Sequence, residues 1–257
     1  MTVFKTIVVA FSMFSSIPMP QIGWTARSMR YALVAFPFVG CACAAALAAW
    51  AYLAQMFGVS ELLRAVGMTV LPLLVTGGIH LDGFADTSDA LCSHGDSAKR
   101  LEILADPHVG AFAVIRVAIY LLMYVGLASS LRIDGVALAC MSLGFVAERA
   151  LGGLAIASFP TSKDSGLAHC FSSAADCARV RLVLSVLTTG LGIALVVVAG
   201  WFGVGVCLAC SLSFAWLHHT IGSFGGVSGD LIGWFIQVCE LGILASLVIV
   251  QLVGGVL

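Results

Sequence analysis

The sequence predicts an all-α polytopic integral membrane helix bundle with about seven transmembrane helices, forming a single domain over residues 1–257. Of its 257 residues, 61% are hydrophobic and 10% are charged, and the mean hydropathy is +1.09. A soluble domain carries about a quarter charged residues, so this chain needs a bilayer as its solvent. The apolar runs are long and do not alternate, and they favour helices over a barrel because spanning backbone must satisfy its own hydrogen bonds.

Seven apolar runs are long enough to cross a bilayer, although the run at 64–80 is barely so. The N-terminal residues 1–20 lack a small-residue cleavage signature, and we expect a retained interfacial or membrane-entering helix rather than a signal peptide. The seven predicted spans are 31–57, 64–80, 109–131, 136–159, 182–200, 203–221 and 231–257.

The basic residues test this topology independently. If the loop with Arg27 and Arg30 faces the cytoplasm, alternation places 81–108, 160–181 and 222–230 on the same side. That side then holds eight Lys and Arg residues and the other side two, as the positive-inside rule requires. Most acidic residues fall on the same side, so the polar loops that could carry chemistry converge there. No basic stripe indicates nucleic-acid binding.

The segment richest in polar residues is GGIHLDGFADTSDAL, residues 77–91. Asp82, Asp86 and Asp89 stand at i, i+4 and i+7, which on a helix places them within an arc of about 60°. Such like charges repel unless cations compensate them. Mg²⁺ prefers oxygen ligands and commonly binds a few carboxylates plus substrate phosphates. We therefore predict a metal-assisted phosphoryl-transfer site here; the alternative is a solvated acidic helix end.

Nearby histidine and basic residues could serve the same site. The carboxylates around His80 are expected to raise its pKa and keep it partly cationic, which suits phosphate binding or proton transfer. A hydrogen-bonded structural histidine is the alternative. Lys99, Arg100 and His108 could hold a substrate phosphate. They could equally be the positive flank of the next span.

Two further loops are polar. The segment FPTSKDSGLAHCF, residues 159–171, contains Lys163 and His169, and it either binds an anion or is an ordinary inner loop. The segment SFGGVSGDLIGWFIQ, residues 223–237, opens a span with Asp230, where a helix N-terminus favours a carboxylate. Helix capping alone would explain that aspartate. Its glycines permit close approach of backbone to a phosphate or large ligand, and the candidates for substrate binding are Gly225, Gly226 and Gly229.

Four residues that are charged at neutral pH lie deep within predicted spans: Arg116, Glu148, Arg149 and Glu240. Such groups are costly in a bilayer and either pair with one another or line a polar cavity. A membrane transporter is the alternative from another functional class, with Glu148, Arg149 and Glu240 as its ion pathway and the aspartates as a cation vestibule. The nine cysteines form no metal-binding pattern, and packing explains them best.

The segment GGIHLDGFADTSDAL resembles the signature of the cobalamin synthase family (adenosylcobinamide-GDP ribazoletransferase). ADPHVGAF, GGVSGDLIGWFIQVCE and FSMFSSIPMP are similar to other stretches of that family and follow its order over nearly the whole chain. The chain departs from the family pattern at Ser15 and Ser16 in place of Thr-Arg, at Lys163 in place of arginine, at Ser228 in place of threonine, and at Trp234 in place of a small residue. None of these changes removes an acidic residue.

The resemblance implies a late step of cobalamin biosynthesis. Adenosylcobinamide-GDP is joined to alpha-ribazole or alpha-ribazole phosphate, and GMP is released with the help of Mg²⁺. It also implies a multi-pass protein of the cytoplasmic (inner) membrane with its site facing the cytoplasm. A CDP-alcohol-type phosphotransferase is a further alternative, and a homo-oligomer or a complex with other cobalamin pathway enzymes stays open. We expect the metal ligands to be Asp82, Asp86, Asp89 and Asp230, with Asp89 as general base and His80 as its rival.

Overall fold

The computed structural model describes residues 2–23, 25–93, 95–162 and 166–254, and these form twelve helices. This confirms the predicted all-α fold; within the described residues the only β-pairing is an isolated bridge between Thr161 and Val227. Six helices are long and apolar enough to cross a membrane. They are α3 (Ala32–Met56), α7 (Ala111–Ser130), α8 (Gly135–Ser158), α10 (Cys177–Ala199), α11 (Trp201–Phe224) and α12 (Gly229–Gly254).

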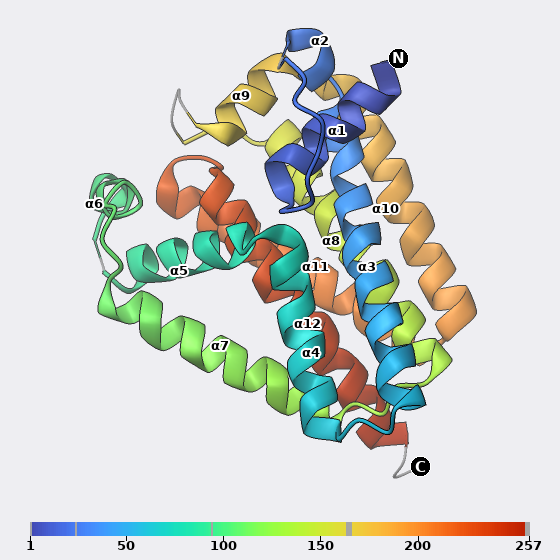
Figure 1. Ribbon diagram of the computed structural model, residues 1–257. Helices are drawn as coiled ribbons and strands as arrows, with labels where there is room; N and C mark the ends of the chain where they lie inside the picture. Colours follow the sequence, from blue (N-terminus) through green and yellow to red (C-terminus); the bar gives the residue numbers. More distant parts are fainter. Residues whose placement is uncertain (1, 24, 94, 163–165, 255–257) are drawn as a thin grey trace.

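The predicted 64–80 span is the one that differs. Helix α4 (Glu61–Thr76) ends earlier than expected, and α5 (Ile79–Cys92) leaves it at an angle of 96°. Gly77 (φ +66°) and Gly78 (φ +80°) form the bend, because two successive left-handed residues favour glycine. The bent pair of α4 and α5 counts as one further candidate span, and α5 runs crosswise to the bundle (Figure 1).

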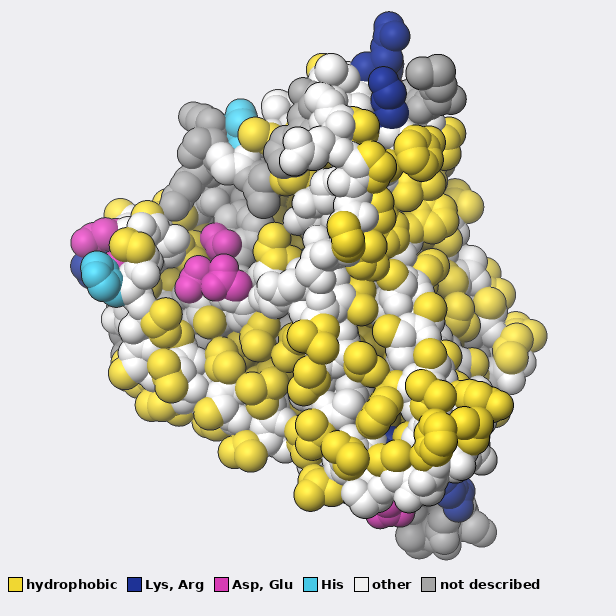
Figure 2. Space-filling view, viewed as in Figure 1, with side chains coloured by type: hydrophobic (Ala, Val, Ile, Leu, Met, Phe, Trp, Pro, Cys, Tyr) yellow, Lys and Arg dark blue, Asp and Glu magenta, His cyan; other side chains and the backbone are white. Residues whose placement is uncertain are grey.

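The short helices are α1 (Thr2–Phe14), α2 (Ala26–Met29), α6 (Ser97–Ile103) and α9 (Leu167–Ala174). In Figure 1, α2, α9 and the N-terminus lie at one end of the bundle, and the α3–α4 turn, the α7–α8 turn and the C-terminus lie at the other. The chain therefore alternates as the charge distribution predicts. Much of the surface in Figure 2 is hydrophobic, as expected for a protein surrounded by lipid.

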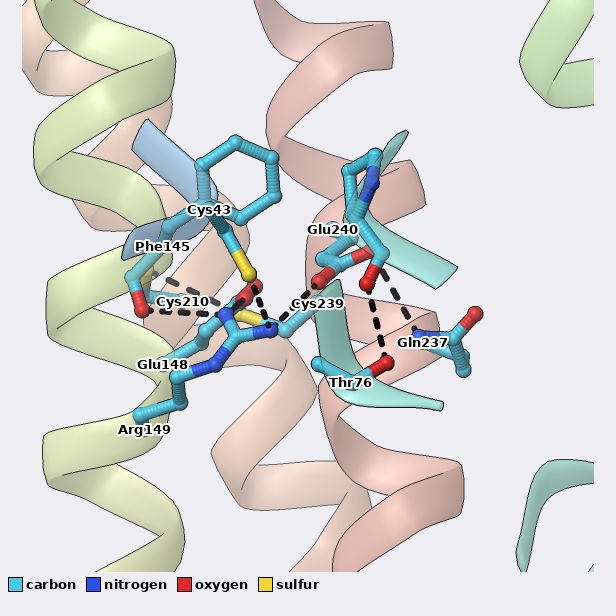
Figure 3. A network of polar contacts seen from close by, with 10 residues as sticks. Cys43, Thr76, Phe145, Glu148, Arg149, Cys210, Gln237, Cys239 and Glu240 are labelled. Carbon is cyan, nitrogen blue, oxygen red and sulfur yellow. Dashed lines mark hydrogen bonds and ion pairs between the residues drawn. The ribbon is translucent and has the colours of Figure 1, made fainter. Parts of the chain in front are cut away.

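A buried ionic network ties the long helices together (Figure 3). The Arg149 side chain on α8 is 0% exposed; it donates to the Phe145 carbonyl at 3.1 Å and to Glu240 Oε1 on α12 at 3.2 Å. It also contacts Glu148, and its Nη2 lies 3.6 Å from the Cys43 Sγ of α3. Pairing, one of the two outcomes left open by the sequence, is therefore found for three of the four membrane-depth ionisable residues.

Helices α5 and α12 cross at glycines. A Cβ added to Gly83 of α5 would lie 2.8 Å from the Asp230 carbonyl oxygen, and one added to Gly233 of α12 would lie 2.9 Å from the His80 carbonyl oxygen. The two backbones are therefore in direct contact, which only glycine permits at both positions. This crossing places the acidic segment of α5 against the first turns of α12.

Replacing Gly233 by alanine tests this crossing. The added methyl group meets backbone atoms that cannot rotate away, and such overpacking costs about 1–3 kcal/mol. The Tm of the purified protein should therefore fall. Gly222→Ala on α11 is the matched control: its Cβ would meet nothing within 4 Å, so the Tm should stay the same or rise. Equal Tm values for both variants would contradict the close crossing. Unfolding can be followed with a thiol-reactive dye, because the buried cysteines include Cys43, Cys140, Cys210 and Cys239.

Candidate active site

The acidic segment is a helix, as predicted, and its two faces differ. Asp82 is exposed, and Asp86 and Asp89 are half-buried on the same side of α5. The buried residues of α5 lie mostly on its other faces and include His80, Phe84 and Thr87. Figure 2 shows acidic side chains gathered over α5 in a recess of the molecular surface. The helix therefore presents its carboxylates outward while its apolar side packs on the bundle.

Asp230 joins this face from α12. The Ser228 hydroxyl caps α12 by accepting from the Leu231 N–H at 3.1 Å, so the helix begins at the point where α5 crosses it. Asp230 stands in the first turn, where the helix dipole favours a carboxylate. Because Asp230 backbone atoms lie against Gly83, residues 147 positions apart in sequence meet at one place (230 minus 83).

The four aspartates act on one another electrostatically. The pKa of Asp86 is raised from 3.8 to about 6, first by burial and then by the negative charges of Asp82, Asp230 and Asp89. The structure therefore brings the predicted metal ligands of α5 and α12 together as one acidic cluster, which we call the aspartate cluster. Its repulsion is the feature that a bound cation would relieve.

The donor chemistry of the aspartate cluster suits a hard cation, although the cluster is not a closed cage. Among the described residues, no three acidic, histidine or cysteine side chains stand close enough together to hold one ion as they are placed. Mg²⁺ does not need such a cage, because it usually keeps several waters and binds one or two carboxylates plus substrate phosphates. Oxygen donors from two helices, with uncompensated charge on Asp86, fit that mode of binding.

Asp89 has a structural contact besides its place in the cluster. Its Oδ1 accepts a hydrogen bond from the Ala113 N–H at 3.3 Å, in the first turn of α7. Gly110, at the N-cap of α7, leaves room for this carboxylate, since an added Cβ would overlap its oxygens. Asp89 therefore caps α7 from a neighbouring helix, which sequence spacing did not indicate.

The expected pKa shift of His80 has the wrong sign. His80 is 4% exposed, its ring lies edge-on to Phe36 at 5.8 Å, and its Nε2 has no hydrogen-bond partner among the described residues. Burial, and then the positive charge of Arg149, lower its pKa. The carboxylates of α5 do not reverse this, because the imidazole faces the bundle and the aspartates face outward.

A polar cleft of about 270 Å³ adjoins the aspartate cluster at Asp230. Its walls come from the end of α6, the residues Thr161 and Ser162, the start of α9 and the start of α12. Gly226 packs against the backbone of Ser162, Gly225 caps α11 with a φ of +70°, and Gly229 opens α12 and lines the cleft. The polar lining residues are Thr161, Ser162, His169, Ser228 and Asp230. The convergence of these loops was predicted from charge topology, whereas the parts played by Thr161 and Ser162 were not.

The predicted phosphate-binding cations are spread more widely. Arg100 is half-buried and points to the end of α11, with Nη1 3.5 Å from the Ser223 carbonyl oxygen. Lys99 pairs with Glu102 at 3.0 Å, and the side chain of His108 is 88% exposed and bonds Asp106 at 2.7 Å. Lys163 lies outside the described residues. Of the described three, only Arg100 lies beside the glycine-rich segment.

Comparison with known proteins covers nearly the whole chain. Residues 6–248 match the family described as cobalamin-5-phosphate synthase. An adenosylcobinamide-GDP ribazoletransferase of Lachnoclostridium phytofermentans is 37% identical over 97% of this chain and 94% of that protein. A protein of the same name from Novosphingobium aromaticivorans is 32% identical over 95% of this chain and 96% of its own length. Another from Clostridium perfringens (strain 13) is 31% identical over 92% of this chain and 94% of its own length. No solved structure matches the chain. The chain therefore belongs to the cobalamin-5-phosphate synthase family.

Proposed function

We propose that this protein is an adenosylcobinamide-GDP ribazoletransferase that joins adenosylcobinamide-GDP to alpha-ribazole or alpha-ribazole phosphate and releases GMP. The observation that carries the proposal is the aspartate cluster of α5 and α12 beside a polar cleft, in a chain of this family. Carboxylates next to a polar cleft suit a reaction between phosphate-bearing substrates. A transporter would use Glu148, Arg149 and Glu240 as an ion pathway, and their mutual pairing gives that function no support.

The reaction is an in-line displacement at phosphorus. The ribose hydroxyl oxygen of alpha-ribazole forms a bond to the phosphoryl group attached to cobinamide. The pyrophosphate bond to GMP breaks, and GMP leaves with the electron pair. Mg²⁺ held by carboxylates among Asp82, Asp86, Asp89 and Asp230 would neutralise charge on the phosphate oxygens. The hydroxyl proton passes to a carboxylate, and we favour Asp89 over His80 because Asp89 faces outward and His80 is buried.

The glycine-rich segment and the cleft would take the phosphates of the nucleotide. Gly229 lines the cleft and Gly225 is exposed at the end of α11, the end at which Arg100 also lies, whereas Gly226 is buried against the Ser162 backbone. Lys99, His108 and Lys163 are proposed as a second group of contacts to the long, anionic substrate. The substrate is soluble, and the excess of basic residues at this end of the bundle supports a site that faces the cytoplasm across the inner membrane.

Release of GMP by the purified protein tests the function. GMP should form from adenosylcobinamide-GDP only when alpha-ribazole or its phosphate and Mg²⁺ are both present. CDP-activated lipids, the substrates of CDP-alcohol phosphotransferases, should release no CMP. Nucleotide products can be separated and measured by liquid chromatography. Turnover of CDP-activated lipids, or none of adenosylcobinamide-GDP, would overturn the assignment.

Variants in the same assay locate the chemistry. Asp86→Asn should lower GMP release by roughly 100-fold or more, the order of effect of removing one electrostatic group from a transition state. The variant should still insert in the membrane, since Asp86 is only half-buried. Glu61→Gln is the matched control, because Glu61 is exposed on α4 at the opposite end of the bundle. Near-native turnover of Asp86→Asn would show that the aspartate cluster is not the reaction centre.

Stability against pH tests the burial of Asp86 together with the repulsion in the aspartate cluster. Folded Asp86, with a pKa of about 6 against the ordinary 3.8, keeps its proton to a higher pH than the unfolded chain does. The metal-free protein should therefore lose stability as the pH rises through that interval, and Asp86→Asn should lose less. MgCl₂ should raise the Tm more at pH 7.5 than at pH 5, because ionised carboxylates bind the cation. A Tm that ignores MgCl₂ at pH 7.5 would contradict metal binding.

A further inference from the structure

A long apolar groove opens on the flank of the bundle, beside α7 and α12. Two cavities lie between α7, α11 and α12. The cavity of about 470 Å³, which we call the upper cavity, also touches α5, and the cavity of about 590 Å³ is the lower cavity. The two cavities adjoin each other, because four residues line both of them: Met123, Trp216, Val238 and Leu241. We call this feature the lateral groove, which runs from Arg116 and Cys92 at one end to Val250 at the other.

The lateral groove does not belong to the active site. Its contacts on α5 include Phe84 and Ser88, and on a helix a step of two residues turns the side chain by about 200°. Phe84 therefore faces nearly opposite to Asp82 and Asp86. A molecule beside Phe84 would therefore lie behind α5 from Asp82 and Asp86, whereas the end of the groove at Arg116 comes within one turn of Ala113, whose N–H donates to Asp89.

The walls of the lateral groove face the lipid. Leu208, Leu212 and Ile249 border it and are 57%, 70% and 58% exposed, although they stand in membrane-spanning helices. From Trp234 to Val250 the wall on α12 is about 24 Å long at the rise of an α-helix. One leaflet of the hydrocarbon core is about 15 Å deep, half of the full thickness. The groove is thus long enough to take a whole acyl chain.

A lone cation stands at the head of the lateral groove. Arg116 is the sixth residue of α7, about 8 Å below the start of the helix. Among the described residues it has no hydrogen bond or ion pair, unlike Arg149. An ionised side chain at membrane depth is costly unless it finds an anion or reaches the interface. Trp216 and Trp234 pack edge-on at 5.0 Å in the same upper cavity, and indole rings favour the headgroup level.

We propose that the lateral groove binds one anionic glycerophospholipid, with the phosphate on Arg116 and an acyl chain along α12. The charge of Arg116 selects an anionic headgroup, and basic pockets between membrane helices are suited to such lipids. The apolar lower cavity, lined by Ala245 and Ser246 among others, takes the chain. A free phosphate ion would contact only Arg116 and would leave the lower cavity unfilled. The proposal is independent of the enzymatic function.

Lipid titration of the detergent-purified full-length protein tests the proposal. Phosphatidylglycerol added in mixed micelles should raise the Tm saturably, since a ligand of the folded state stabilises it. Phosphatidylcholine and inorganic phosphate should not. Arg116→Gln should weaken the apparent affinity for phosphatidylglycerol about fivefold, the value of one basic residue near an anionic lipid. Native mass spectrometry should count one retained lipid on the native protein.

Two further variants distinguish lipid binding in the lateral groove from a general effect of positive charge. Ala245→Phe fills the lower cavity and should also weaken lipid binding, whereas Arg27→Gln, an exposed arginine outside the groove, should bind as the native protein does. Equal stabilisation by both lipids, or unchanged titration of Arg116→Gln, would overturn the proposal. So would a dimer that persists without lipid and is lost in Ala245→Phe, because a second copy would then occupy the groove.

Discussion

The backbone contact between α5 and α12 is the constraint on which the candidate active site depends. Gly83 and Gly233 let the helices touch, and at that separation burial and then the charges of carboxylates from both helices raise the pKa of Asp86. Their repulsion opposes the packing that creates it. Folding alone would disfavour such a cluster of like charges. Its presence is consistent with a role in binding a cation, because bound Mg²⁺ would turn the repulsion into a stabilising interaction.

The buried network anchors α12 near this crossing. Arg149 joins α8 to Glu240, seven residues beyond Gly233 on α12, so the helix is anchored about two turns from the crossing. Removing one member of a buried ion pair typically costs about 3–5 kcal/mol, because the other charge is left uncompensated. An uncompensated charge is costly at Arg116 too, but unlike Arg149 it has no partner in the described chain. The anion that compensates the charge of Arg116 must therefore come from outside the protein.

Hydropathy predicted the spans to within a few residues, and the spacing of Asp82, Asp86 and Asp89 correctly predicted one acidic helix face. Sequence could not predict the bend of α5, because a glycine pair ends a helix without fixing the direction of the next. Nor could it foresee that Asp89 caps α7 or that His80 is buried, since both depend on which face of α5 meets the bundle. Long-range packing, rather than local pattern, decides the electrostatics of this site.

The central claim is that aspartates of α5 and α12 share one divalent cation, and Mn²⁺ binding measured by electron paramagnetic resonance tests it most directly. Mn²⁺ has the same preference for oxygen ligands as Mg²⁺. Asp82→Asn on α5 and Asp230→Asn on α12 should each lower the affinity for Mn²⁺ by about tenfold or more, the effect of about 1.4 kcal/mol in binding. Native affinity in Asp230→Asn, with loss only in Asp82→Asn, would show that α12 contributes no ligand and would contradict the shared site.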